Sequence, residues 1–410
     1  MSSPNPTPSS LRFRLLILDS GAGGLSILAE ILSEIQHLGC LADIDYLADS
    51  AFCPYGDKTE DTISERVIEL CTAAHYQEHY DLIVIACNTA STIVLDALRA
   101  VLSTPVVGVV PAIKPAAVAS ASEPIIVLAT TATIERSYTH KLAKEFAPEH
   151  NIIYLAGSEL VDAIENAVLS STPDHYWWID EHPVSPWSST QASSTRDELL
   201  NNALNLMVES ISRKLQEEQS TSKRIIEAVL SESRTSPIEE LENANSADSS
   251  PLQGAPYQLV LACTHFPLAK ARIEKALHAN PMTAKVNILD SGRAIALRVS
   301  RLLKDASRRD TVDSLRANDP ATANKISADE KNDQPEKAVY RDESLPSIES
   351  EIDRPDSCEE SEVKFSGEYL LCDTKIRCAS TGSSEAAMRY LRFFERYIAN
   401  CTSNTCSTTD

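Results

Sequence analysis

The chain has 410 residues, which is enough for two domains with additional insertions. Its formal net charge of −22 argues against nucleic acid as a main partner, because phosphate binding needs clustered Lys and Arg. The ten cysteines form no CxxC pair and no zinc-type spacing. Because neither an apolar targeting segment nor an apolar run of membrane length is present, we expect a cytoplasmic protein with free thiols and no membrane association.

Strand-like apolar runs and amphipathic helical patterns alternate along most of the chain. The expected strands are 11–18, 44–48, 82–86, 106–110, 125–128, 152–155, 259–262, 286–289 and 368–372. The expected helices are 26–38, 63–74, 90–102, 134–146, 158–169, 196–232, 292–304 and 384–398. This alternation predicts an α/β fold in which helices cover both faces of a parallel sheet.

Two strand–helix series and a short internal repeat favour a duplicated unit. The tetrapeptide Leu-Asp-Ser-Gly occurs at 18–21 and again at 289–292. We expect two similar parallel-sheet α/β domains, with the active site in the cleft between them. The first domain is assigned to 11–112 and 287–400, and the second to 113–286.

Composition sets the remaining segments apart as disordered or helical insertions. Residues 170–256 form an insertion in the second domain, with helical spacing over 199–215 that indicates packing, a cap over the cleft or an oligomer contact. Residues 305–362 are acidic and of low complexity, so they cannot bury enough apolar surface to fold alone. Residues 1–10 are expected to be disordered, and 401–410 to be a frayed tail.

Two cysteines occupy matching positions at the ends of apolar strands. Cys87 ends the run Leu82-Ile-Val-Ile-Ala-Cys, and Cys263 ends Leu259-Val-Leu-Ala-Cys. Short polar residues follow both, so each thiol is expected at the carboxyl edge of a sheet, where ligands bind in α/β proteins. A position just before a helix start lowers a thiol pKa. The alternative is that each cysteine is a small buried hydrophobic residue.

Two activated thiols permit two kinds of chemistry. Cys263 with His265 could act as the nucleophile of a cysteine amidohydrolase, which would leave Cys87 without a task. Alternatively, one thiol removes a proton from a carbon and the other returns a proton on the opposite face. Two similar groups on two similar scaffolds suit the second reaction.

Five motifs in chain order carry a family resemblance. They are Leu18-Asp-Ser-Gly-Ala-Gly-Gly-Leu-Ser26, Pro54-Tyr-Gly56 with Lys58, Ala86-Cys-Asn-Thr-Ala-Ser91, Leu128-Ala-Thr-Thr-Ala-Thr133 and Ala262-Cys-Thr-His-Phe-Pro-Leu268. Together they resemble the glutamate racemases of cell-wall synthesis, over roughly 11–168, 257–304 and 366–396. The resemblance implies cofactor-independent conversion of L-glutamate to D-glutamate for peptidoglycan, without pyridoxal phosphate or metal.

The resemblance also implies roles for individual residues. Cys87 and Cys263 correspond to the acid/base pair, with Asp19 assisting the first cysteine and His265 the second. The implied substrate-binding residues are Asp19, Ser20, Tyr55, Gly56, Asn88, Thr89, Thr131, Thr133, Thr264 and His265. Asp49 and Glu165 match acidic residues near the family's site.

Simpler readings stand beside these roles. Asp19 could cap a helix, His265 could be a core histidine, Tyr55-Gly56 could be a turn, and Glu165 could lie on a solvated helix face. Asp290-Ser-Gly292 is interpreted as structural. The rival functions are an aspartate or hydantoin racemase of the same superfamily, the amidohydrolase, and a binding protein that lost its activity. A homodimer and a nucleotide-precursor activator are further expectations from the resemblance.

Overall fold

The computed structural model describes residues 12–170, 191–232, 254–318, 363–366, 368–371 and 374–405. The predictions for 1–10, for 171–190 and 233–253 of the first insertion, for most of 305–362 and for 406–410 therefore lie outside the described residues. Within the described chain, residues 401–405 continue the last helix rather than forming a tail.

The first sheet has six strands in the order β4–β3–β1–β2–β10–β9, all parallel except β9. The strands are β1 (Arg12–Asp19), β2 (Leu41–Ala48), β3 (Leu82–Ile85), β4 (Val106–Gly108), β9 (Glu368–Leu371) and β10 (Thr374–Ser380). β1 and β3 are buried on both faces, which is why they read as continuous apolar runs.

The second sheet has four parallel strands in the order β6–β5–β7–β8. They are β5 (Ile125–Ala129), β6 (Ile152–Ala156), β7 (Tyr257–Leu261) and β8 (Val286–Leu289). The order repeats that of β2–β1–β3–β4, so the duplicated unit expected from the sequence is present in the strand topology. Because β8 pairs with β7, the chain returns to the first unit at α10, a few residues after 287.

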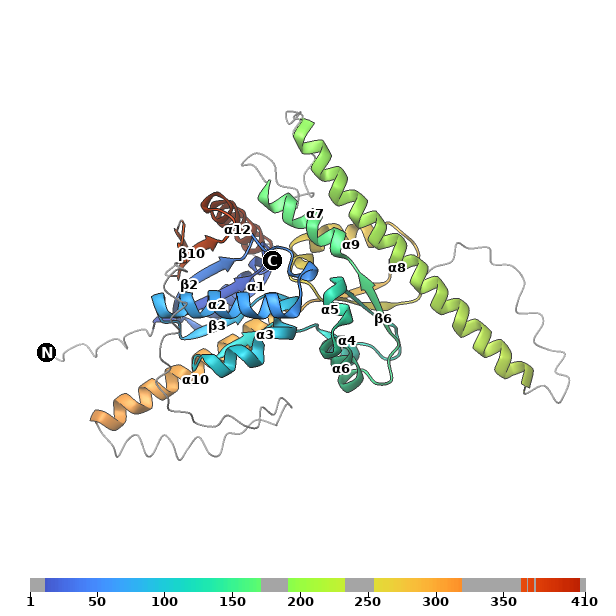
Figure 1. Ribbon diagram of the computed structural model, residues 1–410. Coiled ribbons are helices and arrows are strands. Elements are labelled where there is room, and N and C mark those ends of the chain that lie inside the picture. Colours follow the sequence, from blue (N-terminus) through green and yellow to red (C-terminus); the bar gives the residue numbers. More distant parts are fainter. Residues whose placement is uncertain are drawn as a thin grey trace.

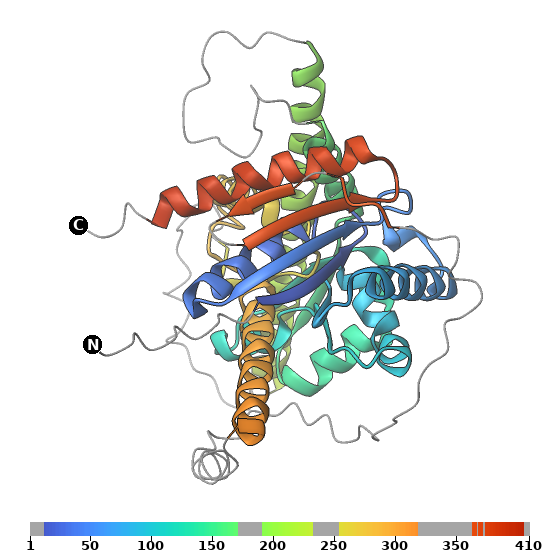
Figure 2. The ribbon, with the colours of Figure 1, turned by 90° about the vertical axis from the view of Figure 1, so that its left-hand side faces the viewer.

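Helices cover both faces of each sheet. In the first unit α1 (Leu25–Leu38), α10 (Gly292–Asn318) and α12 (Ser384–Thr405) pack on one face, and α2 (Glu60–Glu78) and α3 (Asn88–Val101) on the other (Figures 1 and 2). In the second unit α4 (Ile113–Ala119) and α6 (Ser137–Phe146) oppose α7 (Ser158–Leu169), α8 (Gln191–Glu232) and α9 (Lys270–His278). The short elements are η1 (Tyr55–Asp57), α5 (Thr131–Glu135) and η3 (Phe266–Ala269).

One hydrophobic core runs through both units. It joins the α1–α12 face of the first sheet to the α7–α8–α9 face of the second, and Leu200, Leu204, Ile211 and Leu215 of α8 belong to it. The helical spacing over 199–215 therefore reflects packing against α7 and α9. Among the described helices, none is both long enough and apolar enough to cross a bilayer.

Among the longer elements, the sequence analysis did not predict α4, α9 and β10. α4 follows Pro111 without a strong apolar stripe, and no element was expected for most of β10, which lies between the expected strand at 368–372 and the expected helix from 384. β10 is half-buried in alternation, and it becomes a strand because it pairs in parallel with β2, more than 300 residues earlier. Such distant pairing leaves little local signal in a seven-residue segment.

Candidate active site

The first thiol lies at the carboxyl end of β3. Cys87 precedes α3 directly and occupies its N-cap position, with only 7% of its surface exposed. β1 pairs with β3 and brings Asp19 and Ser20 to the same edge of the sheet, with Ser20 Oγ 4.0 Å from Cys87 Sγ. Burial raises the pKa of the Cys87 thiol well above its usual value, and the charge of nearby Asp19 adds to this effect.

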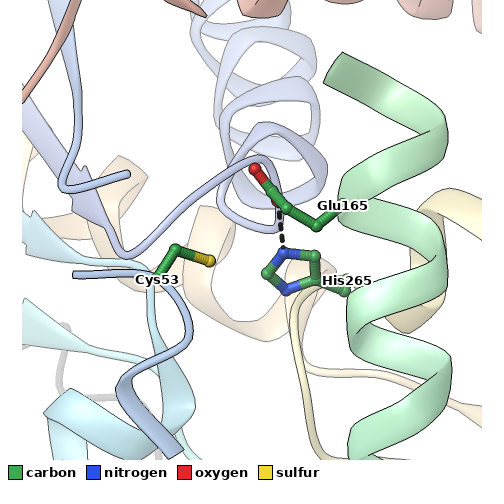
Figure 3. Close-up of side chains that lie close together, drawn as sticks. All are labelled: Cys53, Glu165 and His265. Atoms are coloured by element: carbon green, nitrogen blue, oxygen red, sulfur yellow. Dashed lines mark hydrogen bonds and ion pairs between the residues drawn. The ribbon is translucent and has the colours of Figure 1, made fainter. Parts of the chain in front are cut away.

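The second thiol occupies the equivalent position in the second unit. Cys263 follows β7, is also 7% exposed, and lies 3.7 Å from His265 Nδ1. The other ring nitrogen, Nε2, lies 2.8 Å from Glu165 Oε2 of α7 (Figure 3). The imidazole is therefore held between a thiol and a carboxylate, and His265 is not simply a core residue.

Glu165 is the centre of a buried hydrogen-bond network. Besides His265, its carboxylate accepts hydrogen bonds from Ala22 N at 2.8 Å and from Tyr390 Oη at 2.6 Å. Burial alone would raise the pKa of Glu165, but the hydrogen bonds from His265, Tyr390 and Ala22 lower it below its ordinary value. Burial alone would likewise lower the pKa of His265, but Cys263 and Glu165 raise it well above its usual value. Both shifts favour an imidazolium paired with a carboxylate in the buried site.

Asp19 connects the two units. Its Oδ1 accepts a hydrogen bond from Gly21 N at 2.8 Å, and its Oδ2 accepts one from Thr264 Oγ1 at 3.1 Å. Burial raises the pKa of this carboxyl, an effect only partly opposed by the charge of His265. The N-cap of α1 is Gly24, without a side-chain cap, so the helix-cap reading of Asp19 is wrong.

The glycines of the turn after β1 allow the two units to touch. A Cβ on Gly21 would lie 2.6 Å from Glu165 Oε2, and one on Gly23 would lie 2.5 Å from His265 Nδ1. No side chain fits in either position without displacing the groups that surround Cys263. The Asp-Ser-Gly-Ala-Gly-Gly sequence is therefore needed because the backbone passes directly beside the charged pair.

Small polar side chains line the space between the units. Thr89 Oγ1 lies 3.1 Å from Thr130 Oγ1 and 3.0 Å from Thr133 Oγ1, which joins α3 to the second unit. Asn88 is buried, and its Oδ1 has no hydrogen-bond partner among the residues that the structure describes. An unpaired buried amide oxygen is costly unless a ligand supplies its donor.

The remaining predicted residues lie around a cavity and in the loop after β2. Thr131 is exposed and faces Ser158, while Gly56 packs near Thr130; both line a cavity of about 620 Å³ that Lys58 and Arg136 also border. Tyr55 and Asp49 are buried and bonded to each other at 2.8 Å.

Asp49 serves the architecture of the loop after β2. Its carboxylate also accepts hydrogen bonds from Arg66 Nη2 at 3.1 Å and from Thr381 Oγ1 at 2.5 Å. Asp290, in the repeated tetrapeptide, accepts from Gly292 N and from Lys270 Nζ at the junction between the units. That arrangement agrees with its structural interpretation.

Sequence reasoning missed two residues of the site and a third thiol that lies beside it. Thr130 completes the threonine cluster, Tyr390 reaches Glu165 from α12, and Cys53 lies close to Glu165 and His265 (Figure 3). Cys53 has a local signal, since it directly precedes the Pro54-Tyr55-Gly56 motif. Tyr390 has none, because it is one apolar-face residue of a helix 225 positions from its partner.

Comparisons with known proteins identify a family that this chain resembles. Residues 20–176 match the family model described as Asp/Glu/Hydantoin racemase. A glutamate racemase of Vibrio cholerae is 36% identical over 290 residues, which cover 71% of this chain and 80% of that protein. One from Escherichia fergusonii is 48% identical over 161 residues, covering 39% of this chain and 54% of that protein.

Among solved structures, Escherichia coli glutamate racemase in complex with L-glutamate and the activator UDP-MurNAc-Ala is 32% identical. The match covers 72% of this chain and 83% of that chain, with a TM-score of 0.48. With the extent and identity of the Vibrio match, the chain belongs to the glutamate racemase family.

Proposed function

We propose that the protein interconverts L- and D-glutamate by a two-base reaction in which Cys87 and Cys263 face opposite sides of the substrate's α-carbon. The observation that carries this proposal is the equivalent placement of the two thiols. Cys87 follows β3, which pairs with β1, and Cys263 follows β7, which pairs with β5, so the two thiols stand at equivalent places in the repeated strand order, and each is 7% exposed. A reaction between mirror-image substrates calls for such a pair.

The proposed proton transfers are symmetric. One cysteine, as thiolate, takes the α-proton, and the C–H electrons remain on carbon as a carbanion conjugated with the α-carboxylate. The other cysteine, as thiol, then gives its proton to the opposite face. Cys87 would exchange protons through Asp19 and Ser20, and Cys263 through His265 Nδ1. After one turnover the protonation states of the two thiols are reversed.

The barrier comes from the weak acidity of the α-carbon. Pre-organised donors that bind the developing charge on the α-carboxylate lower this barrier. We propose that Ser20, Thr89, Thr264 and the backbone N–H groups at the start of α3 supply these donors. Asn88 Oδ1, which lacks a partner among the described residues, would accept from the substrate ammonium group.

The cellular setting is proposed on the same basis. D-glutamate would serve peptidoglycan synthesis, and a reducing cytoplasm would keep both catalytic thiols free. No cofactor takes part in the proposed steps. A homodimer and activation by a nucleotide-linked cell-wall precursor remain predictions from the family resemblance.

The decisive experiment is incubation of the purified full-length protein with L-glutamate in D2O without added cofactor. We expect loss of optical activity by circular dichroism together with deuterium at the α-carbon by NMR. If deuterium exchanged into aspartate or a hydantoin but not into glutamate, the substrate of the racemase would be that compound instead of glutamate. Exchange with none of them would overturn the proposal.

The Cys263–His265–Glu165 arrangement also resembles what an amidohydrolase needs, a thiol with an oriented base. A Cys87→Ser variant separates the two functions. Hydrolysis needs only Cys263, so amide turnover that survives in this variant would favour the hydrolase.

A further inference from the structure

A third thiol lies beside the charged pair of the second unit. The ligand atoms of Cys53, Glu165 and His265 all lie within 4.8 Å of one another (Figure 3). Racemisation as proposed above uses Cys87 and Cys263 and gives Cys53 no task. Cys53 is also half-buried, whereas the other two thiols are buried, so it is the most accessible of the three.

The three groups come from three separate elements that are already fixed. Cys53 lies in the loop after β2, which Asp49 anchors through Tyr55 and Arg66. Glu165 lies on α7 and His265 follows β7, with their side chains 2.8 Å apart. A pre-formed constellation of this kind needs little ordering to bind a ligand.

Thiolate, imidazole and carboxylate are the three ligand types that Zn²⁺ takes in proteins. Bonds of about 2.0–2.3 Å in a tetrahedron separate ligand atoms by about 3.5 Å, so a side-chain movement of about 1 Å is enough. The exchange also balances charge. Zn²⁺ displaces the proton of the Cys53 thiol and the Nε2 proton of His265, leaving the buried charge unchanged, and both protons go to solvent.

We infer that Cys53, Glu165 and His265 form a binding site for Zn²⁺ or a similar thiophilic divalent cation, and that the bound metal inhibits the enzyme. The metal takes the place of the hydrogen bond between Glu165 and His265, so the imidazole can no longer hold and return the Cys263 proton. Because Cys53 belongs to the first unit and the other ligands to the second, the metal also joins the units.

Metal binding is tested first without reference to activity. The reduced, metal-free, full-length protein is titrated with Co²⁺, and absorbance follows the thiolate-to-cobalt charge-transfer band. We expect one equivalent to bind, to be displaced by Zn²⁺, and to bind at least tenfold more weakly in Cys53→Ser. Cys40→Ser is the matched control, because Cys40 is also half-buried and lies immediately before β2, outside the cluster.

Inhibition is the second arm, and it depends on the proposed racemase function. We expect Cys53→Ser to keep racemase activity within threefold of the wild type while the half-inhibiting Zn²⁺ concentration rises at least tenfold. Cys40→Ser should be inhibited like the wild type. If Cys53→Ser fails to fold by circular dichroism, Cys53→Ala replaces it in both arms.

Two results would overturn the inference. One is the absence of a charge-transfer band in the wild-type protein. The other is equal cobalt binding by the wild type and Cys53→Ser, which would place the metal on the catalytic thiols. A protein that binds cobalt through Cys53 but does not racemise glutamate would retain the metal site and lose only the proposed function.

Discussion

The two thiols share a scaffold but not their surroundings. Cys87 and Cys263 each follow a buried strand and are equally exposed, at 7%. Cys87 lies beside a hydroxyl and a buried carboxyl, Ser20 and Asp19. Cys263 lies beside an imidazole that Glu165 holds in place. The repeated strand topology thus fixes where the thiols stand, while different side chains of the same unit surround each thiol and set how it would exchange a proton.

The largest expected effect comes from removing either thiol. Cys87→Ser and Cys263→Ser should each lower racemisation by about 10³-fold or more, because a serine hydroxyl is a far weaker base. Each variant still has one base, so it should exchange deuterium from D2O into one enantiomer only, and the two variants should choose opposite enantiomers. Cys71→Ser, a buried thiol in α2, is the control. Exchange of the same enantiomer in both variants would break the comparison.

Variants of His265 and Asp19 should differ in the direction of the reaction in which the isotope effect changes. The equilibrium constant between enantiomers is one, so any variant changes kcat/KM equally in both directions. His265→Gln and Asp19→Asn should each lower it by about 10²-fold. The α-deuterium isotope effect should rise in one direction for His265→Gln and in the other for Asp19→Asn. Identical isotope patterns would show that the two residues do not serve different thiols.

Tyr390 should act only on the Cys263 side. Tyr390→Phe removes one hydrogen bond to Glu165, so the lowered pKa of Glu165 should rise toward its ordinary value. Because the proposed mechanism uses the Glu165 carboxylate to hold His265, the acid limb of the pH–rate profile should move to higher pH, with about a tenfold loss of kcat. Tyr80→Phe, which removes a similar bond to Asp45 at 2.7 Å, should leave the profile unchanged.

The buried Asp19 carboxyl beside Cys87 should lower the stability of the folded protein at neutral pH. Burial raises the pKa of Asp19, so its charged form is disfavoured in the folded protein, and stability is lost as pH rises through the range between the unfolded and folded pKa values. Asp19→Asn should therefore melt about 2 °C or more above the wild type at neutral pH. The difference should vanish near pH 3, where the carboxyl is protonated in both states. Calorimetry at the two pH values measures it.

The smallest effect is expected from the acidic segment. Replacing 310–360 with a Gly/Ser linker of about 20 residues should leave kcat and KM within about twofold of the wild type, since both thiols and their described partners lie outside it. The racemase assay with a circular dichroism spectrum checks this. If the folded variant lost activity, the acidic segment would have a role in catalysis beyond the two thiols and their partners.

The strand ends were readable from the sequence. An apolar run such as 82–85 is buried on both faces of a parallel sheet, and the polar residues after it mark the edge where Cys87 stands. The strand order repeats between the two units, as the internal sequence repeat predicted. β10 was not readable, because its partner β2 lies far away in the chain.

Some residues of the site could be predicted from local motifs, and others were placed only by the fold. Cys87, Cys263 and His265 are carried by local motifs, so their types and spacing were visible. Which carboxylate orients His265 was decided by the fold, since Glu165 and Tyr390 are 100 and 225 residues from their partners. The placement of Thr130 rather than Thr131 in the buried cluster also depends on how α3 meets the second unit.

The sequence by itself determined the α/β class, the duplicated strand series and the two thiols at strand ends, because burial patterns and turn residues act over a few positions. The tertiary structure alone decided which distant groups join these motif residues, among them Tyr390 at Glu165 and Cys53 beside His265. Hydrogen bonds and ion pairs form wherever packing brings donors and acceptors together, and that packing joins segments hundreds of residues apart.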